Sequence, residues 1–564
     1  MPHWLIAGDS LPEVHQEFTQ GLGLPPVVSK ILINRGIHSR EQARKFFKPG
    51  WEDLYDPFLI RDMDKAVDRL SRAVRSGERI LIYGDYDVDG ITSVSLLYLF
   101  ILKIGGNVGF YIPDRLKEGY GLSVAGVTQA AAEGATLLVT VDCGITGIEE
   151  IRMARGLGLD VIVSDHHEQA NALPEAAAIL NPKRNDCTYP FKELAGVGVA
   201  FKFVQAMCLR LGLEDEAAQQ YIDLVALGSA ADIVPLVDEN RVLVKLGMDR
   251  MNRLERPGIR ALAETSGILG KPIGTGQVVF ILAPRINAVG RLGNAQKAVE
   301  LLISGSEEES RAGARVLEAE NRNRKNLDDM TFQQARELIE TEGRLASCRT
   351  LVLAKEGWHP GVIGIVASRI VEQYGRPTVM IALDGDTGKG SARSIASFDI
   401  HSALKQCEDL MESFGGHQHA AGLLIRQDCI EPFRERFERI AAERIGEDDL
   451  TQRIQIDAEI TLPDITDRFV RLLDGFAPFG PQNMRPVFLA RNLNVVGSPR
   501  VVGRNHLKFK VRQGGEVHDA IGFDLGDLIY RLSPGDSNLD MVFVVEENHW
   551  NNEVRTQLRV KDLR

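Results

Sequence analysis

Acidic residues recur where apolar runs end in the first part of this sequence. The run at 79–83 is followed by three aspartates spaced two apart, and the next two apolar runs end in an aspartate and in an Asp-His-His triplet. One more aspartate follows an apolar run later in the chain. The residues are Asp85, Asp87, Asp89, Asp142, Asp165, His166, His167 and Asp232. Carboxylates and imidazoles bind divalent cations, so these spacings indicate metal-assisted chemistry.

If the apolar runs are parallel strands, their acidic ends meet at one edge of a sheet. The carboxylates would then repel one another and raise their own pKa values unless cations neutralised them. Hard oxygen ligands with two imidazoles suit Mn²⁺ or Mg²⁺. Six or more ligands indicate two ions, which could activate a water and stabilise a leaving oxygen. For any single aspartate, a helix cap or a turn is the alternative.

The elements that must position these side chains have an α/β pattern. Apolar runs at 79–83, 136–141 and 160–164 alternate with predicted helices at about 91–104, 122–133 and 146–157. Continuous apolar strands separated by helices indicate a parallel sheet that is buried on both faces.

The chain of 564 residues is long enough for several domains. We expect a helical segment at 1–55, a metal-binding α/β domain at 56–304, a long linking helix at 305–345, a second α/β domain at 346–448 and a small β-barrel at 449–564. The linking helix is predicted from a polar composition with one thin apolar stripe. A helix packed inside one domain is the alternative.

Composition excludes several classes of protein. With 44% hydrophobic and 26% charged residues, the chain is neither disordered, collagen-like nor a membrane protein. Its most apolar stretch, 94–104, contains Ser95 and Lys103 and is too short to span a bilayer. The N-terminus lacks a secretory leader pattern, and the six cysteines have no C-x-x-C spacing, which argues against structural zinc and a disulfide framework. We therefore expect a cytoplasmic protein.

The net charge of −12 argues weakly against a nucleic-acid partner, but its distribution argues for one. Residues 451–564 contain 15 basic and 15 acidic side chains, and the stretch 485–512 has seven basic residues and no acidic one. Strand alternation would place Lys508 and Lys510 on one face, near Arg504 and the ring of Phe509. Basic and aromatic side chains on a barrel fit a single-strand-binding platform of the OB type. The alternatives are a solvated barrel face and a core position for Phe509.

Other segments combine glycines with groups that can bind phosphate or bases. They lie at 113–121 and 280–291 and, in the second α/β domain, at 357–369, 390–394 and 415–422. The candidate substrate-binding residues are Arg115, Tyr120, Arg285, Asn287, Arg291, His359, Ser391, Arg393 and His417. The alternatives are a solvated loop at 113–121, an interdomain salt bridge at 280–291 and structural roles for the histidines. The sequence lacks a P-loop motif, so an ATP-driven motor is not supported.

The motifs in this order resemble the DHH phosphoesterase superfamily, and among its members the single-strand-specific exonucleases, over essentially the whole chain. The resemblance lies in the Asp85–Asp89 motif, Val-Asp142-Cys-Gly, Ser-Asp165-His166-His167, Gly-Ser-Ala-Ala-Asp232 and the Gly-Gly-His417-Gln-His-Ala-Ala-Gly element. It implies that the aspartates and both histidines bind or position two metal ions, with Asp165 orienting a ligand. One departure is the segment Phe479-Gly-Pro-Gln482-Asn483, which stands where a Gly-rich turn is expected.

The resemblance further implies a 5′→3′ exonuclease that acts on single-stranded DNA, releases 5′-mononucleotides, and serves DNA repair, recombination and mismatch repair. Ser391, Arg393 and Arg115 would hold the 5′-phosphate, and His417 would face the scissile bond. Catalysis would involve Asp87, Asp165, His166, His167 and His417. A monomer is expected, with a single-strand-binding protein and a helicase as implied partners. The rival functions are a phosphodiesterase for short oligoribonucleotides or cyclic dinucleotides, and a non-catalytic DNA-binding scaffold.

Overall fold

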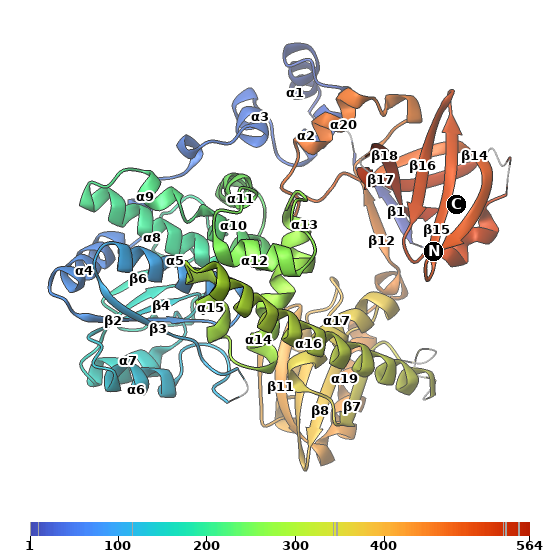
Figure 1. Ribbon diagram of the computed structural model, residues 1–564. Helices are drawn as coiled ribbons and strands as arrows, with labels where there is room; N and C mark the ends of the chain where they lie inside the picture. The colour runs from blue at the N-terminus through green and yellow to red at the C-terminus, as the bar shows by residue number, and fades with distance from the viewer. Residues whose placement is uncertain are drawn as a thin grey trace.

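The protein consists of two α/β domains, a long helix that joins them, and a C-terminal barrel to which the N-terminal segment is attached (Figure 1). The computed structural model describes residues 2–8, 11–115, 117–341, 343, 345, 348–533, 535, 538–550 and 553–564. Among the described residues, no helix combines the length and the apolar sequence needed to cross a bilayer. The predicted fold class, two α/β domains joined by a long helix and followed by a C-terminal β-barrel, is confirmed.

The first domain contains a five-stranded parallel sheet in the order β3-β2-β4-β5-β6. Its strands are β2 (Arg79–Gly84), β3 (Asn107–Tyr111), β4 (Leu137–Val141), β5 (Asp160–Ser164) and β6 (Ala178–Leu180). One face packs on α4 (Met63–Arg75), α5 (Val88–Lys103) and α8 (Gly196–Leu211), and the other on α6 (Val124–Ala132) and α7 (Ile148–Gly156). The sheet is therefore buried on both faces, as the continuous apolar runs predict.

Helices complete this domain after the sheet. They are α9 (Glu216–Gln219), α10 (Ile222–Ala231), α11 (Asp238–Met251), α12 (Pro257–Thr265), α13 (Thr275–Gln277), the π-helical turn η4 (Val278–Leu282), α14 (Ala283–Leu292) and α15 (Gln296–Ile303). The apolar run before Asp232 is helix α10, and the aspartate caps its C-terminus.

The long helix α16 (Glu307–Thr341) packs against both α/β domains. Arg285 of α14 forms an ion pair of 2.7 Å with Glu318 of α16, and Arg369 of the second domain forms one of 3.0 Å with Asp328 of α16. Asp328 is buried, although this helix has a polar composition. The helix therefore links the two domains and also fixes their separation.

The second domain has a mixed sheet in the order β10-β11-β9-β8-β7. Its elements are β7 (Leu351–Glu356), α17 (Pro360–Tyr374), β8 (Thr378–Asp384), β9 (Thr387–Arg393), α18 (Ile400–Lys405), β10 (Ser413–His417), β11 (Ala420–Arg426) and α19 (Ile430–Arg444). Only β7 and β8 run parallel; the other neighbours are antiparallel.

The C-terminal sheet closes into a barrel because β14 pairs with both β15 and β17. Its elements are β12 (Arg453–Ile456), β13 (Ala458–Glu459), α20 (Asp467–Asp474), β14 (Phe488–Val502), β15 (His506–Gln513), β16 (Glu516–Gly522), β17 (Leu539–Trp550) and β18 (Glu553–Leu563). Figure 1 shows it on the side of the molecule opposite the parallel sheet.

The N-terminal segment belongs to the barrel in its packing. Its elements are β1 (His3–Ile6), α1 (Pro12–Gln16), α2 (Pro26–Asn34) and α3 (Arg40–Phe47). Strand β1 pairs in parallel with β12, and Phe18 and Ile31 share a hydrophobic core with Phe469 and Phe488. The apolar face of this segment is thus buried against residues more than 400 positions away in the sequence.

One arginine joins the N-terminal segment, the first domain and the barrel. Arg241 of α11 is buried and donates hydrogen bonds to backbone carbonyls of Phe46, at the end of α3, and of Gly475, Phe476, Ala477 and Pro478, which follow α20. The negative ends of two helix dipoles therefore replace a carboxylate partner. Burial, and then the charge of Arg35, lower the pKa of Arg241 to about 9.

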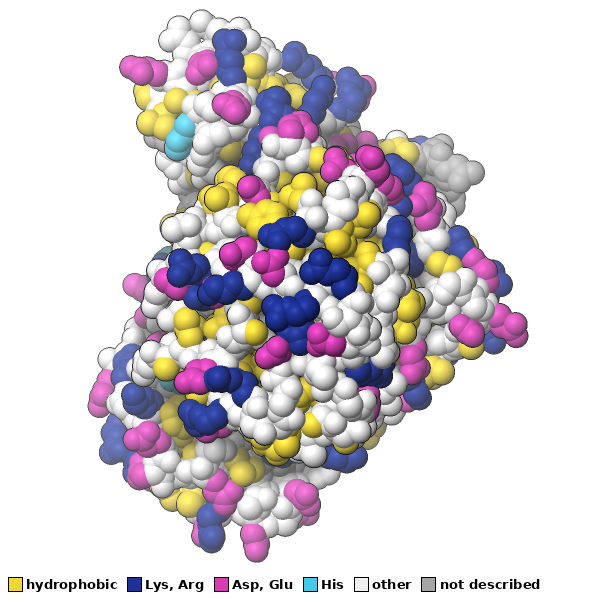
Figure 2. Space-filling model, turned by 90° about the vertical axis from the view of Figure 1, so that its left-hand side faces the viewer, with side chains coloured by type: hydrophobic (Ala, Val, Ile, Leu, Met, Phe, Trp, Pro, Cys, Tyr) yellow, Lys and Arg dark blue, Asp and Glu magenta, His cyan; other side chains and the backbone are white. Residues whose placement is uncertain are grey.

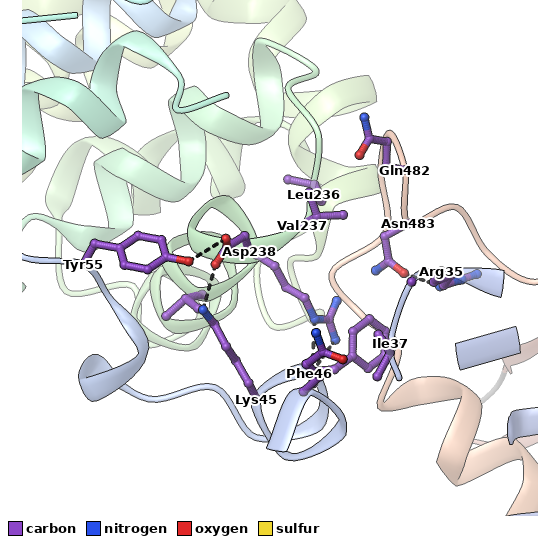
Figure 3. Close-up of a pocket in the computed structure, with 14 residues that line it drawn as sticks. Arg35, Ile37, Lys45, Phe46, Tyr55, Leu236, Val237, Asp238, Gln482 and Asn483 are labelled. Atoms are coloured by element: carbon purple, nitrogen blue, oxygen red, sulfur yellow. Dashed lines mark hydrogen bonds and ion pairs between the residues drawn. The ribbon is translucent and has the colours of Figure 1, made fainter. Parts of the chain in front are cut away.

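The segment after Phe476 docks on the first domain. Leu236 donates its N–H to the carbonyl of Pro481 at 2.9 Å, and the Thr275 hydroxyl donates to the carbonyl of Phe479 at 2.7 Å. Figure 3 shows Asn483 and Arg35 together at this junction, opposite Asp238. The segment Phe479–Asn483, which stands where a Gly-rich turn is expected, is therefore an interdomain contact.

We predict that Arg241→Met lowers the free energy of unfolding by about 3 kcal/mol, because five buried carbonyls lose a charged donor. Urea unfolding followed by circular dichroism measures this loss. Asp249→Asn, an exposed position on the same helix, is the matched control and should match the wild type. An unchanged midpoint for Arg241→Met would contradict the assigned role of this arginine.

Candidate metal centre and anion site

The acidic motifs come together at the carboxyl edge of the parallel sheet. Asp85 follows β2, Asp142 follows β4 and Asp165 follows β5, and these strands are hydrogen-bonded neighbours. Asp232 reaches the same place from the end of α10. Figure 2 views the molecule from the side of this domain, and on this face Lys and Arg are interspersed with Asp and Glu.

Helix N-termini hold two of the carboxylates. Asp87 caps α5 by accepting the N–H groups of Asp89 and Gly90. Asp89 accepts the N–H groups of Gly196 and Val197 at the start of α8, at 2.6 and 2.8 Å. Asp87 and Asp89 therefore do bind helix N-termini, the alternative role that the sequence left open for single aspartates. These hydrogen bonds also orient both carboxylates within the cluster. No pattern in the sequence indicated the role of Gly196, which lies in a segment too short to identify as a nucleotide-binding loop.

His166 lies at the centre of the cluster. Its Nε2 is 3.1 Å from Asp142 Oδ1, 3.7 Å from Asp232 Oδ2 and 3.8 Å from Asp89 Oδ2. Among the described residues, His166 Nε2, Asp142 Oδ1 and Asp85 Oδ1 are buried without a hydrogen-bond partner. Buried polar atoms are normally satisfied, so converging unsatisfied groups of this type fit a divalent cation.

Three overlapping groups have ligand atoms close enough to share an ion. They are Asp85, Asp87 and Asp142; Asp89, His166 and Asp232; and Asp142, His166 and His167. Each group offers one ligand atom per residue, and all atoms in a group lie within 4.8 Å of one another. Asp142 belongs to two groups, as does His166, so two neighbouring ions could share ligands here.

Burial and mutual repulsion disfavour the charged carboxylates. Burial, followed by the charge of Asp87, raises the pKa of Asp89 to about 7 and raises the pKa of Asp85 well above its ordinary value. Burial and the charge of Asp89 raise the pKa values of Asp142 and Asp232 in the same direction. A bound cation would reverse these shifts because it stabilises the ionised carboxylate.

Asp165 orients the histidines and is not a member of the three ligand groups. Its Oδ1 accepts from the backbone N–H groups of His166 and His167 and lies 2.7 Å from His167 Nδ1. Burial opposes the charge of Asp165, but the hydrogen bond with His167, the charge of that imidazole and the N–H of Ile145 together outweigh it and lower the pKa of this carboxyl. The same hydrogen bond raises the pKa of His167 against the effect of its burial. Burial lowers the pKa of His166 to about 3, so its imidazole is neutral.

Close backbone approach allows the cluster to form. A Cβ atom on Gly196 would lie 2.7 Å from Asp142 Oδ1, and one on Gly90 would lie 2.4 Å from the Asp85 carbonyl oxygen. Glycine is therefore required at both positions. Tyr120, flanked by two glycines with positive φ, donates toward His167 Nε2 at 2.8 Å.

Next to the acidic cluster lies a cluster of arginines from both α/β domains. Arg291 donates to the carbonyl of Gly361 near the start of α17, at 3.2 Å. Burial, and then the charges of Arg115, Arg324 and Arg393, lower the pKa of Arg291 to about 10, and the charge of Asp87 acts in the opposite direction. An anion placed between the arginines would relieve this repulsion. Arg324 lies on α16. The sequence did not indicate it as a substrate-binding candidate, because the polar composition of this helix predicts only a solvated face.

Ser391 and Arg393 lie side by side on β9, where Arg393 donates to the Ser391 hydroxyl at 3.1 Å. A Cβ atom on Gly364 of α17 would lie 2.8 Å from the Ser391 hydroxyl and 2.9 Å from the Arg393 guanidinium, so this helix packs directly on both. His359 caps α17 by accepting the N–H of Gly361. These contacts bring the N-terminus of α17 to the arginine cluster.

Of the remaining predicted substrate-binding residues, Arg285 and His417 lie apart from the arginine cluster. Arg285 is buried in its ion pair with Glu318, the salt bridge that the sequence left as the alternative to substrate binding. His417 lies at the exposed end of β10, and among the described residues no hydrogen bond or ion pair connects it with the acidic cluster. Asn287 is half-buried, one helical turn before Arg291.

In the barrel, alternation along β15 turns Lys508 and Lys510 outward and buries Phe509. Phe509 is thus a core residue, as the alternative had it. Lys508 pairs with Arg500 of β14 and with Ile521 of β16, which in turn pairs with Arg559 of β18. Arg500, Lys508 and Arg559 thus form a basic row across neighbouring strands. Arg559 could not be predicted from the sequence, because only the strand pairing places it in this row. Arg504 lies exposed in the turn before β15.

A cavity of about 370 Å³ lies at the junction of the N-terminal segment, α11 and the barrel (Figure 3). Its lining contains no residue of the acidic or arginine clusters. It is therefore separate from the metal centre.

A parallel sheet with aspartates and an Asp-His-His triplet at its edge defines a DHH-type phosphoesterase. The sequence models of the DHH family N-terminal domain, the DHHA1 domain and the RecJ OB domain match residues 79–229, 347–443 and 456–562. These matches correspond to the two α/β domains and the barrel.

Relatives extend the similarity over the whole chain. The single-stranded-DNA-specific exonuclease RecJ of Bacillus subtilis is 39% identical over 97% of this chain and 69% of its own, and that of Escherichia coli is 36% identical over 90% of each. The crystal structure of RecJ in complex with Mn²⁺ from Thermus thermophilus superposes with a TM-score of 0.86 at 30% identity, covering 100% of this chain and 79% of that one. The chain belongs to the RecJ family of single-stranded-DNA-specific exonucleases.

We predict that Mn²⁺ stabilises the protein more at pH 8 than at pH 6. The raised carboxyl pKa values mean that the metal-free native state retains protons that the unfolded chain has released between pH about 4 and 7. Stability without metal should therefore fall as the pH rises through this window, and a cation that displaces the protons should restore it. Melting temperatures with EDTA or Mn²⁺ measure both effects.

Asp89→Asn should flatten this pH dependence, and Asp64→Asn, at an exposed position of α4, should leave it unchanged. An equal Mn²⁺ effect at both pH values would contradict the assignment.

We predict that Gly196→Ala weakens Mn²⁺ binding by ~10-fold or more, because the added Cβ displaces the Asp142 carboxylate. Isothermal titration calorimetry measures the affinity. Gly198→Ala is the matched control on the same helix, since its Cβ would meet only the Leu194 side chain, at 3.3 Å. Equal affinities for the two variants would rule out this steric effect.

Proposed function

We propose that the protein is a 5′→3′ exonuclease that hydrolyses single-stranded DNA to 5′-mononucleotides with two Mn²⁺ or Mg²⁺ ions. The observation that carries the proposal is the arginine cluster beside a buried acidic cluster, where Arg291 interacts electrostatically with both Arg393 and Asp87. This arrangement would hold a terminal phosphate next to the reacting bond. Membership of the RecJ family supports the choice of substrate.

The proposed metal ligands are Asp85, Asp87, Asp89, Asp142, His166, His167 and Asp232. When bound, the two ions would supply an activated water and stabilise the leaving oxygen. Asp165 would fix the orientation of His167 through the bond to Nδ1, so that Nε2 faces the site. Asp87 and Asp89 would be oriented toward the ions by their hydrogen bonds with the N-termini of α5 and α8.

Arg115, Arg291, Ser391 and Arg393 are the proposed 5′-phosphate site, together with the N-terminus of α17 capped by His359. Guanidinium groups and helix N-termini both bind phosphate. Tyr120, Asn287 and His417 are proposed to contact the nucleotides on either side of the scissile bond. Arg285 would instead support the site through α16.

The row Arg500, Lys508 and Arg559, with Lys510 and Arg504 beside it, is proposed to hold the trailing strand on the barrel. Outward cations across neighbouring strands form a surface that can follow a sugar–phosphate backbone. We further propose a cytoplasmic monomer that works with a single-strand-binding protein and a helicase in DNA repair and recombination. The buried thiols of Cys143 and Cys208 are consistent with a reducing compartment.

The test uses single strands and blunt duplexes of the same sequence with a 5′-phosphate and a 3′-label, incubated with Mn²⁺, Mg²⁺ or EDTA. We expect a ladder shortened from the 5′ end, formation of mononucleotides, strong preference for the single strand and no product in EDTA. Asp87→Ala and His166→Ala should lose activity by at least ~100-fold, because each removes a metal ligand. Asp249→Ala is the control at a remote exposed position.

Each rival predicts a different result. Faster cleavage of di- and trinucleotide RNA than of long single-stranded DNA would indicate the phosphodiesterase. Full activity of Asp87→Ala would exclude this metal centre, and binding without cleavage by the wild type would indicate the scaffold. Degradation from the 3′ end, or equal attack on the duplex, would overturn the proposed polarity or strand preference.

A further inference from the structure

Phe280 is exposed to an unusual degree for a large aromatic residue. Its side chain is 78% exposed, and it lies in η4, the π-helical turn between α13 and α14. Burying a phenylalanine side chain stabilises a fold, and this residue largely forgoes that gain. Aromatic side chains are enriched at binding surfaces, whereas most charged side chains are depleted there. In addition, π-helical turns are frequent at functional sites.

Phe280 begins a ridge of accessible residues along this helical segment. Phe280, Pro284, Asn287 and Arg291 are spaced by four, three and four residues, so they share one helical face. The last three are half-buried, whereas the opposite face, with Leu282, Ile286 and Val289, is fully buried. We call these four residues the ridge.

The ridge connects the barrel side of the molecule with the metal centre. Five residues before Phe280, the Thr275 hydroxyl donates a hydrogen bond to the carbonyl of Phe479 in the interdomain segment. At the other end, a Cβ atom on Gly290 would lie 2.6 Å from the carbonyl oxygen of Tyr86, which adjoins Asp85. Phe280 and Arg291, the two ends of the ridge, are roughly 16.5 Å apart along the helix at 1.5 Å per helical residue. Figure 1 shows α13 on the side of the first domain that faces the barrel, and α14 between the parallel sheet and the second α/β domain.

We propose that the ridge is the path of the DNA strand between the barrel and the metal centre, and that Phe280 stacks on one nucleobase of that strand. The inference deepens the proposed function and rests on it. An aromatic ring stacks on any base, so the contact is independent of sequence. Asn287 and Arg291 would bind the polar backbone of the same strand as it enters the arginine cluster.

This contact also bears on strand preference. A base in a duplex is already stacked on both sides and paired, whereas a base in a single strand can turn toward a protein ring. Phe280 would therefore contribute binding energy to single strands and none to duplexes. It is a positioning residue, since the acidic cluster and not Phe280 carries out the chemistry.

The first experiment compares Phe280→Ala, Phe280→Leu and Phe280→Trp with the wild type. Fluorescence anisotropy in EDTA gives the affinity for a 5′-phosphorylated single strand, and steady-state kinetics in Mn²⁺ give kcat and KM. We expect Phe280→Ala to weaken binding and raise KM by ~10-fold with kcat unchanged, Phe280→Leu to be intermediate and Phe280→Trp to bind at least as well as the wild type. Melting temperatures should not change, because the side chain is exposed.

Met330→Ala, at a 59% exposed position of α16, is the matched control and should leave affinity and KM unchanged. A result in which all Phe280 variants bind and cleave like the wild type would overturn the inference. The proposed function would survive that result as long as the wild type degrades single strands from the 5′ end.

The second experiment identifies stacking itself. Strands with one abasic nucleotide, moved stepwise from the 5′ end, replace the normal substrate. We expect the wild type to lose affinity at one position, and Phe280→Ala to be indifferent to base removal at that position. An equal penalty for Phe280→Ala and the wild type at every position would mean that Phe280 contacts no base, and the inference would fail.

Discussion

Three carboxyl groups crowd around one buried histidine nitrogen, and the rest of the structure is arranged to make that possible. Parallel strand order brings Asp85, Asp142 and Asp165 to one edge. The N-termini of α5 and α8 meet the acids with backbone N–H groups, and glycines allow the backbone to approach. These contacts only partly offset the repulsion, since the pKa values of the carboxyl groups remain raised. The remaining cost is one that divalent cations remove, so the site is built to be completed by them.

An acidic pocket would repel a phosphodiester, and the second α/β domain supplies the opposite charge. Arg393 comes from β9 and Arg291 from α14, on the two sides of the domain boundary. The bond from Arg291 to Gly361 and the two ion pairs of α16 fix the distance between the domains. The arginine cluster and the acidic cluster are therefore held in fixed relative positions by the scaffold rather than brought together by a long flexible linker.

Local patterns in the sequence were sufficient to predict the strands and the acidic residues that follow them. Apolar runs predicted β2, β4 and β5, and the acids at their ends are adjacent because parallel strands fix their direction. Long-range partners were beyond such patterns. The carboxylate that pairs with Arg285, the row position of Arg559 and the attachment of β1 to β12 all depend on contacts between distant segments. Burial of Asp328 in a polar helix was invisible for the same reason.

A rigid frame has a consequence for strand preference. Arg241 ties the barrel and the N-terminal segment to α11, and the Phe479–Asn483 segment docks on the same domain. If the barrel holds the trailing strand, the nucleic acid has to adapt its path to the fixed position of the barrel, because the protein cannot move the barrel without breaking these buried bonds. A duplex has a persistence length of about 150 bp and resists bending over a few nucleotides. A single strand is far more flexible, so a fixed barrel favours it before any base is contacted.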